Sequence, residues 1–96
     1  MLFPDSFERN NIGGIVVKTQ EAVVMRIKGL CEEKNIKISQ LAYISGMPPS
    51  TLKNVMQGNS KNTGIVTIKT ICDGLNISLE DFFCCEVFRD LEQEID

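Results

Sequence analysis

Apolar residues recur at helical spacing along most of the chain, and turn-forming residues separate one such stretch from the next. A first helix is predicted over residues 19–35, with Thr19 as its N-terminal cap. Its apolar stripe consists of Val23, Ile27, Leu30 and Cys31. Residues 1–18 show no such period, and Ile15-Val16-Val17 has strand propensity without an evident partner, so we expect an arm or a loose strand there.

Two short helices are predicted in the middle of the chain. The first covers about residues 39–45, and Gly46 supplies the left-handed residue that ends it. The second starts at Pro48-Pro49, because proline is tolerated in the first turn of a helix, and Gly58 ends it. Their apolar residues are Leu41, Ala42 and Ile44 in the first helix and Leu52, Val55 and Met56 in the second.

Two further helices are predicted after a polar loop. Thr63 or Thr67 can cap the fourth helix and Asn76 ends it. Ser78 caps the fifth helix, whose first turn is acidic and so complements the helix dipole. The residues expected to point into the core are Ile68, Ile71, Cys72 and Leu75 in the fourth helix and Leu79, Phe82 and Phe83 in the fifth.

The last residues continue the apolar spacing on an otherwise acidic stretch. The apolar seam consists of Cys84, Phe88, Leu91 and Ile95. This seam either packs on its own domain or contacts a second copy of the chain, and we favour a homodimer contact. The pattern therefore predicts an all-α fold with five helices and no sheet, divided into an N-terminal arm (1–18), a helical domain (19–83) and an acidic C-terminal helical extension (84–96).

Charges are segregated along the sequence. The chain of 96 residues has 10 basic and 13 acidic residues, a net charge of -3. Residues 34–72 contain five lysines and no acidic residue, a local charge of +5, which leaves a charge of -8 elsewhere. The middle of the chain therefore suits contact with a polyanion, although a solvated lysine-rich surface has the same composition.

The two middle helices have the residues of a helix-turn-helix corner. Ala42 is small enough for a close helix crossing, Gly46 takes the positive φ of the turn, and Leu52 fills the angle between the helices. The segment from Gln40 to Leu52, QLAYISGMPPSTL, resembles the helix-turn-helix of the Cro and phage-repressor (XRE) family, and the similarity extends over about residues 26–83. The resemblance implies a five-helix bundle of the lambda-repressor-like type, with the helix-turn-helix at about 39–57.

The same resemblance implies a sequence-specific transcriptional regulator, repressor-like, that binds duplex DNA. The helix over residues 49–57 would read the major groove, with Asn54 suited to adenine and Lys53 to guanine or phosphate. The loop over residues 61–63 would hold the phosphate backbone. The residues expected to contact DNA are Lys37, Ser50, Thr51, Lys53, Asn54, Gln57, Lys61, Asn62 and Thr63.

The chain departs from the family pattern in two places. Lys37 and Ile38 stand where the family has a capping Ser or Thr followed by polar residues, and Pro49 replaces a position that often contacts a base. No Arg is present in the motif, so we expect weak affinity per monomer, which favours dimeric or accessory binding.

Other functional classes find little support in the sequence. The chain has no His, no Cys-x-x-Cys pair and no Gly-rich phosphate loop, so we expect no enzyme, no metal and no cofactor. Cys31 and Cys72 fit reduced core positions, whereas Cys84 and Cys85 are ambiguous. Its apolar runs are too short for a membrane span and the N-terminus lacks the features of a signal peptide, so we expect a cytoplasmic protein.

One rival function stays open. The overall acidity also suits a protein-interaction or antitoxin-like helical module that binds a partner protein and lacks strong DNA binding of its own. Binding to duplex DNA that weakens steeply with salt distinguishes the regulator from this module.

Overall fold

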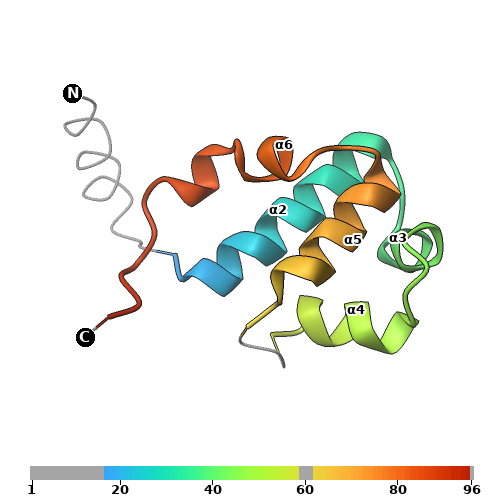
Figure 1. Cartoon of the computed structure of the whole chain (residues 1–96), viewed down its shortest axis with the longest axis horizontal. Helices are drawn as coiled ribbons and strands as arrows, with labels where there is room; N and C mark the ends of the chain where they lie inside the picture. The colour runs from blue at the N-terminus through green and yellow to red at the C-terminus, as the bar shows by residue number, and fades with distance from the viewer. Residues whose placement is uncertain (1–16, 59–61, 96) are drawn as a thin grey trace.

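A computed structural model of the chain describes residues 17–58 and 62–95. Figure 1 shows the elements in order: α2 (Thr19–Lys34), α3 (Ile38–Ile44), α4 (Pro49–Met56), α5 (Ile65–Leu75), α6 (Leu79–Phe83) and the short 3-10 helix η1 (Glu86–Phe88). Across these two ranges there is no strand, only one isolated β-bridge. For the described residues, the prediction of an all-α fold with five helices is confirmed.

Left-handed residues end the helices where the sequence indicates. Asn35 and Asn76 follow α2 and α5 with φ of 57° and 61°, and Gly46 and Gly58 follow α3 and α4 with φ of 67° and 77°. Asn is one of the few residues that adopt this conformation without a large penalty, and Gly adopts it freely. These four positions therefore set the lengths of the helices.

The predicted starts of two helices are wrong. Thr19 is the first residue of α2 rather than its cap, and the carboxylate of Glu21 accepts a hydrogen bond of 3.1 Å from the backbone N–H of Lys18. Gly64 caps α5, so neither Thr63 nor Thr67 does. At α2 the Glu21 carboxylate takes the N–H that precedes the helix, and at α5 the hydroxyl of Thr63 is engaged by Gln20 instead.

The starts of the other helices agree better with the sequence. Pro49 is the first residue of α4, and α3 starts at Ile38, one residue earlier than expected. Ser78 caps α6 as predicted, because its hydroxyl accepts a hydrogen bond of 3.0 Å from the N–H of Asp81.

One hydrophobic core joins the helices, and α3 contacts α2, α4 and α5. The buried cluster contains Val23, Ile27, Leu30, Cys31, Leu41, Ala42, Leu52, Val55, Ile68, Ile71, Cys72, Leu75 and Phe82. The predicted stripes of α2 and α5 are all in this cluster. Cys31 and Cys72 are free buried thiols, as expected, and burial raises their pKa.

Phe83 does not point into the core as predicted. It is 38% exposed, and Leu79 is half-buried, so Phe82 alone of the apolar residues of α6 is fully buried. Leu79 and Phe82 lie one turn apart and both pack against the core, whereas the residue after Phe82 is turned about 100° away. The ring of Phe83 contacts that of Phe88 instead, with centroids 5.0 Å apart.

The C-terminal segment, residues 84–95, is not the continuous helix that its apolar spacing suggests. Only η1 is helical in it, and this 3-10 turn packs against α2. Phe88 lies 6.0 Å from Phe82 between ring centroids, and Leu91 forms a parallel bridge with Val17. The apolar residues of this segment therefore do not form a seam along one helix. Val17 has a partner, Leu91, that the sequence did not reveal. The rest of the predicted strand, Ile15-Val16, lies outside the described residues.

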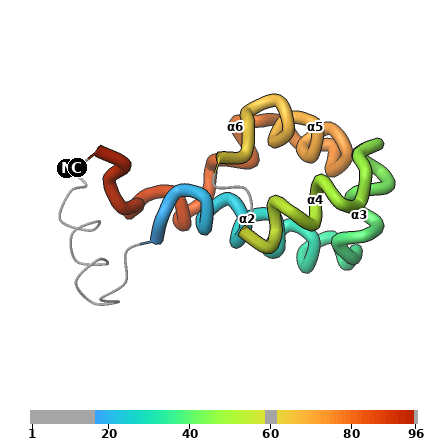
Figure 2. The backbone as a smooth tube through the Cα atoms, turned by 90° about the horizontal axis from the view of Figure 1, so that it is seen from below, coloured from blue at the N-terminus to red at the C-terminus, as the bar shows by residue number. Residues whose placement is uncertain are grey.

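Two long-range contacts hold the ends of helices together. The guanidinium of Arg26 donates hydrogen bonds of 2.7 Å to the carbonyls of Asp81 and Phe82, which fixes α6 against α2. At Gly74, α5 approaches the end of α3 so closely that an added Cβ would lie 3.1 Å from the Cα of Ser45. Figures 1 and 2 place the α3–α4 pair at one end of the molecule and residues 89–95 toward the other.

Candidate nucleic-acid interface

The corner between α3 and α4 has the geometry that the sequence predicts. Ala42 and Leu52 are almost completely buried at the crossing, and Gly46 turns the chain with its positive φ. The N–H of Met47 donates to the carbonyl of Ala42 at 3.1 Å, which closes the turn. Leu41 and Val55 complete the small core of the corner, so α4 is held with one face inward.

The other face of α4 is exposed. Ser50, Thr51, Lys53, Asn54 and Gln57 are all classed as exposed. Leu52 and Val55, on the inner face, are buried. A helix fixed in this way on an apolar stripe presents its polar side chains outward. An α-helix fits into the major groove, so these side chains can reach base edges there.

The loop between α4 and α5 is attached to the start of α2. The amide of Gln20 donates to the hydroxyl of Thr63 at 2.7 Å and accepts from the N–H of Thr63 at 3.2 Å. Sequence reasoning missed Gln20, because it is 43 residues away from Thr63 and belongs to no motif. This double contact positions Thr63, which is half-buried as a result.

Part of the predicted set meets around one hollow of about 230 Å³. Its lining includes the polar residues Thr51, Asn54, Asn62, Thr63 and Thr67. Gly64, which caps α5 and has no side chain to accept from its first N–H groups, is also in the lining. Hydroxyls, amides and the N-terminal end of a helix are groups that bind phosphate and base edges.

The remaining predicted residues lie elsewhere on the described surface. Lys53 and Gln57 line a second hollow between α3 and α4, and Lys37 is exposed directly before α3. Ser50 is exposed in the first turn of α4, and Lys61 lies outside the described residues. The structure thus brings Thr51, Asn54, Asn62 and Thr63 together around one hollow, whereas Lys53 and Gln57 line the other.

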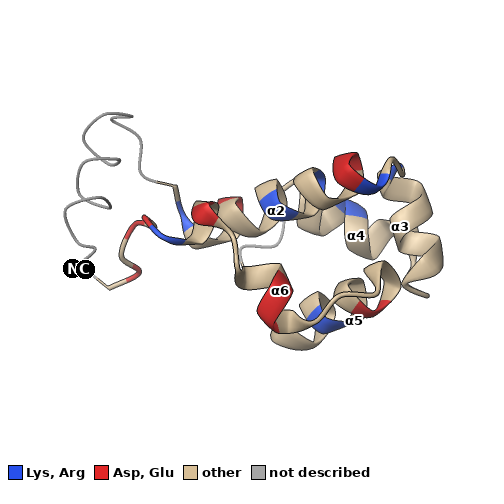
Figure 3. Ribbon diagram, turned by 90° about the horizontal axis from the view of Figure 1, so that it is seen from above, with Lys and Arg blue, Asp and Glu red and all other residues tan. Residues whose placement is uncertain are grey.

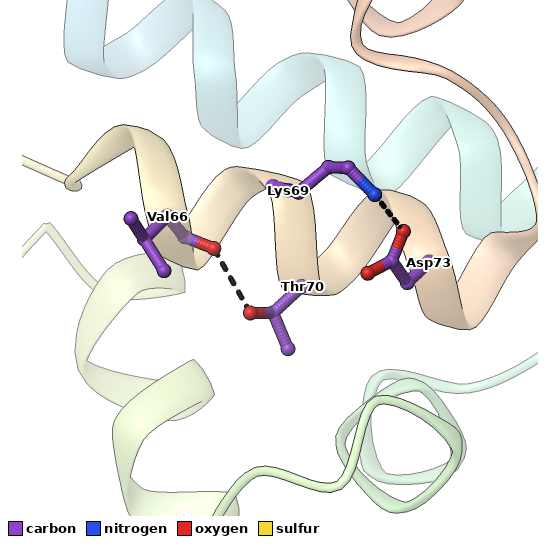
Figure 4. Close-up of polar contacts among 4 residues, drawn as sticks. All are labelled: Val66, Lys69, Thr70 and Asp73. Atoms are coloured by element: carbon purple, nitrogen blue, oxygen red, sulfur yellow. Dashed lines mark hydrogen bonds and ion pairs between the residues drawn. The ribbon is translucent and has the colours of Figure 1, made fainter.

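The lysines of the middle segment are not equivalent. Lys69 forms an ion pair with Asp73 one turn further along α5, as Figure 4 shows. The same figure shows the Thr70 hydroxyl donating to the carbonyl of Val66 at 2.9 Å. Lys69 therefore adds little to the positive charge predicted for residues 34–72. Figure 3 shows the one basic residue of α4 and acidic residues on α6 and the C-terminal segment.

The described part of the chain contains no cluster of acidic or cysteine side chains that could hold a metal ion. Cys84 is exposed and Cys85 half-buried, and both are free thiols. None of the helices is long and apolar enough to cross a membrane within residues 17–58 and 62–95.

The family of Cro/C1-type HTH DNA-binding domains matches residues 26–86. This match covers more than half of the chain, and the chain belongs to that family. Its structure is similar to the crystal structure of prophage Lp1 protein 11, with 29% sequence identity and a TM-score of 0.69. That similarity covers 79% of this chain and the whole of the other. No curated protein matches the sequence.

Proposed function

We propose that this protein is a sequence-specific transcriptional regulator, repressor-like rather than enzymatic, that binds duplex DNA and reads the major groove with α4. One observation carries the proposal: in a chain of the Cro/C1-type family, α4 buries Leu52 and Val55 and exposes Ser50, Thr51, Lys53 and Asn54. The amide of Asn54 suits the N6 and N7 atoms of adenine, and Lys53 suits guanine or a phosphate.

The loop between α4 and α5 has a separate role in this proposal. Asn62 and Thr63 bind the phosphate backbone next to the groove, helped by the first N–H groups of α5. Gln20 is a positioning residue, since it holds Thr63 by two hydrogen bonds. Lys37 adds a phosphate contact at the start of α3.

The proposal is tested by selecting bound duplexes from a random DNA pool and titrating the protein against the selected sequence at several salt concentrations. We expect affinity to fall steeply as salt rises, because phosphate contacts release counterions. Asn54→Ala should weaken binding about tenfold or more, the usual effect of removing a base contact. Lys28→Ala, an exposed lysine on α2, is the control for Lys53→Ala and should change affinity little.

Two results would contradict the proposal. If no duplex is selected at low salt, the protein is a helical interaction module, for which its net charge of -3 is better suited. If the selected duplex is bound equally well by Asn54→Ala and Lys53→Ala, α4 does not read the groove.

The proposal includes binding as a pair of copies on adjacent half-sites. The motif contains no Arg, so one copy has few strong contacts with bases and phosphates. Cys84 and Ile95 are exposed and available to a second copy, whereas Phe88 and Leu91 contact their own domain. Light scattering of the complex should give two copies per duplex, and one copy on a full selected site would contradict this part.

A further inference from the structure

An apolar hollow of about 320 Å³ lies between α3 and α4. Ile38, Ser39 and Ala42 line it from α3, and Pro49, Leu52 and Met56 line it from α4, so its walls are largely apolar. Lys53 and Gln57, two of the residues proposed to contact DNA, line the same hollow. The hollow is therefore continuous with the proposed DNA-binding face.

The starts of both helices meet at this hollow. Ile38 is the first residue of α3 and Pro49 is the first residue of α4. Neither side chain has a polar group, and Pro49 also lacks a backbone N–H. The side chains of Ile38 and Pro49 can therefore offer a base edge only an apolar contact.

Duplex DNA offers one apolar group in the major groove, the 5-methyl group of thymine. The charges around the hollow favour DNA over an apolar protein partner. Lys53 lines the hollow, and Lys37, which is exposed, directly precedes Ile38. A partner without negative charge would have to desolvate these ammonium groups without pairing them, which is unfavourable, whereas phosphates pair with them.

We propose that the hollow between Ile38 and Pro49 binds the 5-methyl group of a thymine, so that the protein distinguishes thymine from uracil and cytosine at one position of each half-site. This inference rests on the proposed function, because it assumes that α4 lies in the major groove. It adds a base-specific contact at the starts of α3 and α4.

The test replaces each thymine of the selected duplex with uracil, one at a time, which removes only the methyl group. We expect one position per half-site at which this change weakens binding about three- to fivefold, the factor for withdrawing one methyl group from an apolar site. At the other positions the affinity should change less than about twofold.

Variants locate the contact on the protein. Ile38→Ala should bring the thymine-to-uracil affinity ratio at that position close to one, because the wall of the hollow is removed. Ile44→Ala makes the same change at the other end of α3, outside the hollow, and should keep the ratio. The ratio is compared within each variant, so a loss of overall affinity or stability does not change the reading.

Three results would overturn the inference. If no thymine is sensitive to uracil although the duplex is bound, the hollow does not bind a methyl group and the proposed function stands. If Ile38→Ala keeps the full thymine-to-uracil ratio, the methyl group is bound elsewhere. If no duplex is bound at all, the inference fails together with the proposed function.

Discussion

The α3–α4 corner and the C-terminal segment, residues 84–95, have similar apolar spacing but different structures. In the corner, the apolar positions belong to two helices, each followed within two residues by a glycine with positive φ, Gly46 and Gly58. In the C-terminal segment the helix stops at once: the N–H of Cys84 donates to Asp81 and that of Cys85 to Phe83, which tightens the chain into a turn. The apolar spacing predicted a helix in both regions, but helices form only in the corner, where the backbone hydrogen bonds continue.

The largest expected difference between the two regions is in side-chain truncation. Leu52→Ala in the corner should lower the free energy of unfolding by about 2–5 kcal/mol, because a fully buried side chain leaves a cavity. Phe88→Ala in the C-terminal segment should lower it by only about 1–2 kcal/mol, since Phe88 is half-buried and water can fill its place. Urea denaturation measures the free energy of unfolding of both variants. Equal decreases would show that the two regions contribute alike to stability.

A second test concerns the packing of the α3–α4 corner against α5. Gly74→Ala should destabilise the protein by about 1–3 kcal/mol, because the new Cβ meets the backbone of Ser45 at the end of α3. Gly29→Ala is the matched control inside α2, where nothing lies within 4 Å of the new Cβ. It should stabilise the protein by about 0.5–1 kcal/mol through helix propensity. Thermal melts show whether each variant is more or less stable than the unchanged protein. Stabilisation by Gly74→Ala would show that α3 is not held closely against α5.

A third test examines α6, the last α-helix before the C-terminal segment. Ser78→Ala should lower the free energy of unfolding by about 1 kcal/mol, because the N–H of Asp81 loses its acceptor. Ser50→Ala removes an exposed hydroxyl from α4, where no side chain caps the helix, and should change stability by less than about 0.5 kcal/mol. If both variants melted alike, the cap of α6 would contribute nothing.

The smallest effect is expected at the bridge between the two ends of the described chain. Glu92→Pro removes the N–H that donates to the carbonyl of Val17 at 2.9 Å, and should lower stability by about 0.5–1 kcal/mol. Gln93→Pro makes the same change one residue later, outside this hydrogen bond. Hydrogen exchange of the first turn of α2 should increase only in Glu92→Pro, and the same increase in both variants would refute a role for the bridge.

Much of the candidate site could be predicted because its determinants are local. Ala42, Gly46 and Leu52 define the corner within eleven residues, and the alternation of buried and exposed residues on α4 follows from the helical period. The caps of α2 and α5 could not be predicted in the same way. Thr63 is a plausible cap by residue type, but its hydroxyl is engaged by Gln20 from the start of α2.

The amino-acid sequence alone determined the helices, their left-handed ends and the inward and outward faces of α4, because these depend on neighbours within a few residues. Only the tertiary structure decided three other features: the attachment of Thr63 to Gln20, the anchoring of α6 by Arg26, and the return of the C-terminal segment to Val17. Each of these joins residues more than 40 positions apart. Such contacts depend on the path of the whole chain, which no local spacing of apolar residues records.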